Sequence, residues 1–181
     1  YAKTANREKA WTKKQSQPFS IFMSSSTDPW QSAEKKYRIT RKVLHAMTTI
    51  PTDELILQTH SHAILEDIEI IEEMSRNCKL RVHISIEGDR ERLPGLPPPP
   101  SSVGDRIKTL QQLSSRGIFT VGCISPLYPL DDADRFFSRI KSAGTSAVVI
   151  DHFILGDGTP DGSRTKKTPL PSLMQKVLPE S

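Results

Sequence analysis

The sequence predicts an α/β fold in which parallel strands form a partial (β/α) barrel. Short apolar runs rich in β-branched residues alternate with longer segments of helical periodicity, and a short polar segment follows each run. The chain has 181 residues, whereas a closed eight-stranded barrel needs about 250. Five βα units therefore favour an open, curved sheet, with a flat, doubly wound parallel sheet as the alternative.

The pattern places each element in turn. Strands are expected at 19–23, 55–57, 80–86, 119–124 and 147–150, and helices at 31–49, 64–77, 103–116 and 131–143, with a further charged helix at 2–14. Gly117 and Gly144 directly follow two of these helices, as C-terminal glycine caps do, and Pro51 lies just beyond another. A parallel sheet of this kind would have a strand before the 2–14 helix, and the sequence contains none.

Two segments lie outside this alternation. The run Pro-Gly-Leu-Pro-Pro-Pro-Pro at 94–100 cannot form regular helix or strand, because proline fixes φ and lacks an N–H donor. Residues 156–181 are rich in Gly, Pro, Ser, Thr and Lys and are expected to be irregular, with a short helix near 172–177. The predicted organisation is thus a barrel core at 1–155 followed by a C-terminal tail.

Composition narrows the class of protein. The net charge of +4 is compatible with an anionic ligand or with nucleic acid, and it selects neither. The two cysteines, Cys78 and Cys123, have no metal-ligand spacing and suggest no disulfide framework, so a reducing cytoplasm is expected. No run is long enough to span a membrane and no signal peptide is recognisable, so no membrane partner is expected.

Polar residues gather where the expected strands end. In a parallel barrel the carboxyl ends of the strands converge on one site. The residues at these ends are Ser26, Thr27 and Asp28; Gln58, Thr59, His60, Ser61 and His62; Ser85 and Glu87; Ser125 and Tyr128; and Asp151 and His152, with Arg106 at a helix start nearby. This ring offers donors, acceptors and a permanent cation, and it predicts a pocket for a polar, partly zwitterionic small molecule.

Alternative functions stay open on these residues alone. A metal-dependent hydrolase could use His60, His62 and His152, although histidines in loops usually have solvent or backbone partners. A non-catalytic or degenerate module could keep the fold and bind a nucleotide or a partner. No nucleophile elbow and no glycine-rich phosphate loop is present, so no catalytic residue is assigned.

Several of these segments, taken in order, resemble the radical SAM proteins related to spore photoproduct lyase, a group similar to DNA repair photolyases. The first is Ser24-Ser25-Ser26-Thr27-Asp28-Pro29-Trp30-Gln31, followed by Glu34-Lys35-Lys36-Tyr37-Arg38 and Thr40-Arg41. Further matches are Gln58-Thr59-His60-Ser61, the strand serine Ser85, Pro94-Gly95-Leu96-Pro97 with Arg106-Ile107, and the loop at 125–132. The resemblance covers about residues 1–156.

The resemblance implies a partial barrel that binds S-adenosylmethionine beside a 4Fe–4S cluster and generates a 5′-deoxyadenosyl radical in a lyase-like reaction. It implies that Ser26, Thr27 and Asp28 contact the amino group of the methionine moiety of the cofactor. It also implies that Ser85 contacts the polar groups of the cofactor and that Arg106 contacts its carboxylate. His60 stands where the family usually has lysine, and Tyr1 stands where a tyrosine follows the last cluster cysteine. An electron donor such as flavodoxin or ferredoxin, and a nucleic-acid substrate, are the implied partners.

The chain departs from the family at its start. The Cys-x3-Cys-x2-Cys motif that holds the cluster is absent, and Leu93 replaces the glutamate that usually precedes Pro-Gly. We therefore expect a radical SAM fragment that lacks its first strand and its cluster loop. Such a fragment would be inactive by itself.

Overall fold

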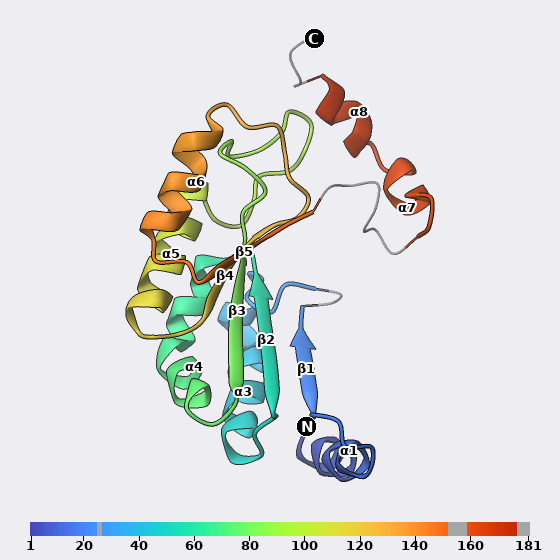
Figure 1. Cartoon of the computed structure of the whole chain (residues 1–181), viewed down its shortest axis with the longest axis vertical. Coiled ribbons are helices and arrows are strands. Elements are labelled where there is room, and N and C mark those ends of the chain that lie inside the picture. The colour runs from blue at the N-terminus through green and yellow to red at the C-terminus, as the bar shows by residue number, and fades with distance from the viewer. Residues whose placement is uncertain (25–26, 152–158, 177–181) are drawn as a thin grey trace.

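A five-stranded sheet in which all strands are parallel forms the centre of the protein (Figure 1). The structure is a computed structural model that describes residues 1–24, 27–151 and 159–176. Its strands are β1 (Ser20–Met23), β2 (Glu54–Thr59), β3 (Lys79–Ser85), β4 (Thr120–Ile124) and β5 (Ala147–Ile150), and they lie side by side in chain order. The α/β class and each of the five predicted strands are therefore confirmed.

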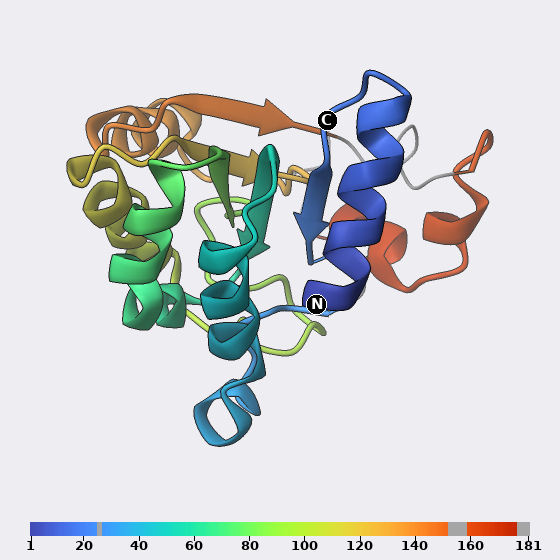
Figure 2. The same cartoon turned by 90° about the horizontal axis from the view of Figure 1, so that it is seen from below.

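The connecting helices cover one face of this sheet. The helices of the described residues are α1 (Ala2–Lys14), α2 (Glu34–Tyr37), α3 (Ile39–Thr49), the 3-10 helix η1 (His62–Asp67), α4 (Ile68–Ser75), α5 (Val103–Ser115), α6 (Ala133–Ser142), α7 (Ser163–Lys166) and α8 (Leu170–Gln175). The connecting helices α3, α4, α5 and α6 all lie on the same side of the sheet (Figure 2), while α1 lies beside β1 at the sheet edge. Because all strands are parallel, each connecting segment returns the chain to the amino end of the next strand. The carboxyl ends of all five strands therefore lie at the same edge of the sheet.

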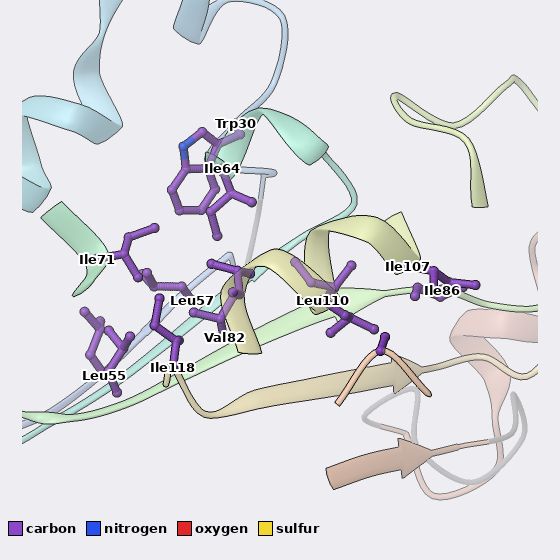
Figure 3. Close-up of a cluster of buried hydrophobic side chains, with 14 of the residues drawn as sticks. Trp30, Leu55, Leu57, Ile64, Ile71, Val82, Ile86, Ile107, Leu110 and Ile118 are labelled. Atoms are coloured by element: carbon purple, nitrogen blue, oxygen red, sulfur yellow. The ribbon is translucent and has the colours of Figure 1, made fainter. Parts of the chain in front are cut away.

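The hydrophobic core lies between the sheet and these helices (Figure 3). Alternate residues of β2, including Leu55 and Leu57, are fully buried, and so are Val82 and Ile84 of β3. Leu110 of α5 packs into the same cluster. Burial of each such side chain contributes about 1.5–3 kcal/mol, so the core fixes the register of the central strands and with it the positions of the residues at their ends.

The helix expected at 31–49 is wrong in one respect, since it is broken in two at Arg38. This residue has a left-handed backbone conformation with φ 51° and ψ 38°, which ends α2 and begins α3 in a new direction. A carboxylate oxygen of Glu34 accepts a hydrogen bond from the backbone N–H of Arg41 at 3.2 Å, and the Arg38 guanidinium pairs with Glu66 at 2.6 Å. These contacts stabilise a break that no glycine or proline marks in the sequence.

The other expected elements need small corrections. The segment predicted as one helix at 64–77 begins as the 3-10 helix η1 and continues as α4. The C-terminal segment contains α7 as well as the expected short helix, which is α8. The described residues include no helix that is long and apolar enough to cross a bilayer.

Candidate functional site

Polar side chains from three neighbouring strands meet at the carboxyl edge of the sheet. Asp28 follows β1, His60 directly follows β2, and Glu87 follows β3. Because β1, β2 and β3 are adjacent and parallel, these three residues form a row across the sheet edge. Arg106, on the first turn of α5, extends the row at its far end. We call Asp28, His60, Glu87 and Arg106 the charged row.

Asp28 anchors the row at β1. Its Oδ1 accepts hydrogen bonds from the Trp30 backbone N–H at 2.9 Å and from the Thr59 hydroxyl at 2.6 Å, and its Oδ2 accepts one from the His60 backbone N–H at 2.8 Å. Burial alone would raise the pKa of Asp28, but the hydrogen bonds from His60, Thr59 and Trp30 outweigh it and hold the pKa below its ordinary value. Asp28 is therefore ionised and already supplied with donors from the protein itself.

His60 lies between two carboxylates. Its Nδ1 is 3.5 Å from Oδ2 of Asp28 and its Nε2 is 2.9 Å from Oε1 of Glu87. Asp28 and Glu87 raise the pKa of His60 to about 9, against the lowering effect of burial. His60 is accordingly a cation at neutral pH.

Glu87 joins His60 to the buried guanidinium of Arg106. Nη1 of Arg106 donates to Oε2 of Glu87 at 2.9 Å and to the backbone carbonyl of Ser85 at 2.8 Å. Burial would raise the pKa of Glu87, but His60 and then Arg106 lower it overall. The Ser85 hydroxyl, also buried, accepts a hydrogen bond from the Gln58 side chain at 3.2 Å, so Gln58 of β2 and Ser85 of β3 continue the network inward.

A cavity of about 380 Å³ opens beside the row. Its lining combines charged side chains, among them His60, Glu87 and Arg106, with apolar and aromatic ones, which are Leu93, Leu96, Tyr128 and the four prolines at 97–100. Sites for small molecules have volumes of roughly 300–1,000 Å³. The cavity is therefore large enough for a small ligand that has a charged end and an apolar or aromatic body.

Three buried polar atoms of cavity-lining residues have no hydrogen-bond partner among the described residues. They are Oε1 of Glu87, Nε of Arg90 and Nε of Arg106. Nε2 of His60 approaches Oε1 of Glu87 as an ion contact rather than as an aligned hydrogen bond. Buried polar groups without partners cost free energy, so a ligand that supplies both donors and acceptors would stabilise this arrangement.

Not all of the predicted site residues come together. Ser85, Arg106, His60 and Asp28 belong to one network, and Thr27 is exposed just before Asp28. Ser26 and His152 lie outside the described residues.

Tyr1 lies elsewhere. Its hydroxyl donates to the backbone carbonyl of Ile50 at 2.6 Å, and Ile50 precedes the amino end of β2. The structure therefore places Tyr1 at the opposite edge of the sheet from the charged row.

The histidines do not gather as metal ligands in the described part of the chain. Nδ1 of His62 is 2.8 Å from the Ser101 hydroxyl, and His60 is held by Asp28 and Glu87. Within residues 1–24, 27–151 and 159–176, no three His, Cys, Asp or Glu side chains are arranged to hold a metal ion. The hydrolase hypothesis gains no support from these residues.

Sequence reasoning missed the contribution of the loop after β3. Arg90 and Arg92 both line the cavity, yet neither was expected at the site. The signal available was the charged run Arg90-Glu91-Arg92 directly before the proline segment. Glu87 and Tyr128 were expected at the strand ends, and the structure adds that Glu87 is the link between His60 and Arg106.

Comparison with known proteins returned no matching family model and no matching curated protein.

Proposed function

We propose that the carboxyl edge of this sheet binds S-adenosylmethionine and that the chain is the cofactor-binding part of a radical SAM protein. The observation that carries the proposal is the charged row, in which residues predicted from separate motifs form one continuous network beside a cavity of suitable volume. The choice of S-adenosylmethionine as the ligand rests on the resemblance of these motifs, in the same order, to the proteins related to spore photoproduct lyase.

The topology supports an open barrel as the architecture for this role. The strands lie in the order β1-β2-β3-β4-β5 with α3 to α6 on one side, whereas a doubly wound sheet reverses its strand order and has helices on both faces. A sheet with sequential parallel strands and helices on one side is what a segment of a (β/α) barrel looks like. We therefore interpret the fold as a partial barrel with β1 at one edge.

The chemistry of the site suits the methionine moiety. A zwitterionic amino acid needs an acceptor for its ammonium group and a cation for its carboxylate. Oε1 of Glu87 has no aligned donor and Nε of Arg106 has no acceptor among the described residues, so these two atoms match the two ends of the zwitterion. Tyr128 and the prolines of 97–100 also line the cavity, and an adenine ring could pack against these side chains.

Asp28 has a different role in this proposal from the one the resemblance implies. Its oxygens already accept hydrogen bonds from Trp30, Thr59 and His60. We infer that Asp28 positions His60 and the end of β2, and that Glu87 provides the acceptor for the ligand ammonium.

The residues of this chain do not fit an iron–sulfur cluster. Cys78 precedes β3 at its amino end and Cys123 lies in β4, and burial raises the pKa of both thiols, which disfavours the thiolate form that iron requires. Cluster ligands would have to come from outside residues 1–181. The chemistry that such a cluster and cofactor supply together is hydrogen-atom abstraction, and no residue here is assigned to that step.

Binding of S-adenosylhomocysteine tests the proposal without any cluster. Isothermal titration of the chain should show one site, and Glu87→Gln should weaken binding about tenfold, since the neutral amide cannot pair with the ammonium group. Glu73→Gln, at an exposed position of α4, is the matched control and should bind as the wild type does. Absence of binding, or equal binding by Glu87→Gln, would contradict the proposal.

A further inference from the structure

Positive charge is in excess around the cavity beside the charged row. Its lining includes four cations, His60, Arg90, Arg92 and Arg106, against two carboxylates, Glu87 and Glu91. These carboxylates already have partners. Glu87 contacts both His60 and Arg106, so one carboxylate serves two cations.

Glu91 is committed to the start of α5. Both of its carboxylate oxygens accept from the backbone N–H of Val103, at 2.9 and 3.2 Å. An acidic side chain in this place satisfies a helix N–H that has no partner within the helix and interacts with the helix dipole. Its charge is therefore directed at the helix and not at Arg90 or Arg92 of the same loop.

Arg90 and Arg92 both have side-chain N–H donors without an acceptor among the described residues. Arg90 pairs through Nη2 with Asp131, while its Nε is buried without a partner among the described residues. Arg92 is exposed, and no hydrogen bond or ion pair of its side chain is present in the described part of the chain. A guanidinium presents donors in a planar fork that matches the oxygens of a phosphate or carboxylate.

Apolar side chains in the same cavity indicate what kind of molecule would carry the anion. They are Leu93, Leu96, Tyr128 and the prolines of 97–100. Such side chains favour a flat, apolar body and lower the local dielectric, which strengthens the interaction of the arginines with an anion. A dianionic group gains more from two guanidinium groups than a monoanion does.

We propose that the part of the cavity lined by Arg90 and Arg92 binds the phosphate group of an aromatic or heterocyclic phosphate monoester. S-adenosylmethionine carries no phosphate, so this ligand is a different molecule. Its aromatic body would pack against the same Tyr128 and proline side chains, so the two ligands compete for the cavity. Binding of the phosphate monoester does not depend on the function proposed above.

Phenyl phosphate is the probe, because it has the dianionic group and the aromatic body but no adenosine. Isothermal titration should show saturable binding, with benzoate binding about tenfold more weakly because it has one charge. Arg92→Gln and Arg90→Gln should each weaken phenyl phosphate binding about tenfold. Arg81→Gln, at an exposed β3 position that does not line the cavity, is the matched control and should have no effect.

Asp131→Asn separates a direct role of Arg90 from a structural one. The substitution removes the carboxylate that competes for Arg90, at a side chain that is 65% exposed, so phenyl phosphate should bind at least as tightly as to the wild type. Weaker binding by Asp131→Asn, no loss in Arg92→Gln, or no binding of phenyl phosphate at all would each overturn the proposal. S-adenosylhomocysteine titrated into the wild type without phenyl phosphate tests the function proposed above separately, because that ligand has no phosphate group, so failure of either proposal can be told from failure of the other.

Discussion

Nε2 of His60 lies 2.9 Å from Oε1 of Glu87, so the residue that follows β2 is tied to the loop that follows β3 by an ion pair. The same imidazole is 3.5 Å from Asp28 beyond β1. One protonated side chain thus links the carboxyl ends of three strands. Because His60 and the loop after β3 also line the cavity, the charge state of His60 contributes to the electrostatics of the candidate site.

The first prediction concerns pH. The pKa of His60 is about 9 in the folded protein against an ordinary value of 6.5, so its contribution to stability is fully present below about pH 6.5 and is lost as the pH rises through about 9. The His60 side chain is 42% exposed, and after allowance for solvent screening we expect about 1–2 kcal/mol. Urea unfolding from neutral to alkaline pH should show this loss in the wild type and not in His60→Gln.

The control for this measurement is His45→Gln, at an exposed position of α3. It should keep the alkaline loss of the wild type. If His60→Gln and the wild type lose stability in parallel between about pH 7 and 10, the ion pair does not contribute as described.

The second prediction concerns Asp28. Its substitution by alanine leaves the Thr59 hydroxyl and the N–H groups of Trp30 and His60 without their acceptor, and we expect the free energy of unfolding to fall by about 2–4 kcal/mol. The contribution of the ionised form should also disappear as the pH falls through the lowered pKa of Asp28. Thr27→Ala, at an exposed neighbour, should change the unfolding free energy by less than about 0.5 kcal/mol. Equal effects of the two substitutions would contradict this role.

Much of the fold follows from sequence pattern because burial periodicity dictates it. The expected strand at 119–124 matches β4 to within one residue, since a short apolar run that contains β-branched residues is typical of a strand in the centre of a parallel sheet. The break at Arg38 did not follow, because non-glycine residues in the left-handed region are stabilised by distant partners, here Glu66, which a local pattern does not contain.

The location of the candidate site could be predicted from the sequence, but the contacts within it could not. That His60 and Glu87 would lie near one edge follows from parallel strand order alone. Their direct contact depends on side-chain conformations and on the register of β2 against β3, which sequence periodicity does not specify. Tyr1 shows the limit of inference from a resemblance, since its hydroxyl is bonded to Ile50 at the other edge of the sheet.

The third prediction concerns the two tryptophans. Trp30 is 4% exposed and its indole Nε1 donates to Oδ2 of buried Asp67 at 2.8 Å, whereas Trp11 is 59% exposed. Trp30→Phe keeps an aromatic ring in the core but leaves Asp67 with one donor fewer, so we expect a loss of about 1–3 kcal/mol in urea unfolding. The variant should also lose the blue-shifted component of the fluorescence emission. Trp11→Phe should leave both the stability and that component intact, and the reverse pattern would show that the environments are exchanged.

The last prediction concerns the contact between the proline loop and α8. Gly95 has φ +88°, and a Cβ at this position would lie 2.9 Å from Cδ2 of Leu173. Gly95→Ala therefore combines backbone strain with displacement of Leu173, whereas Gly117→Ala, at φ +74° with no atom within 4 Å of the new Cβ, has the strain alone, about 1 kcal/mol. We expect Gly95→Ala to cost about 0.5–1 kcal/mol more than Gly117→Ala. In a Leu173→Ala background this excess should vanish while the cost of Gly117→Ala stays the same, as measured by urea unfolding and by hydrogen exchange of the α8 amides. An excess that persists without the leucine side chain would mean that the extra cost of Gly95→Ala comes from the backbone conformation of Gly95 and not from its contact with Leu173.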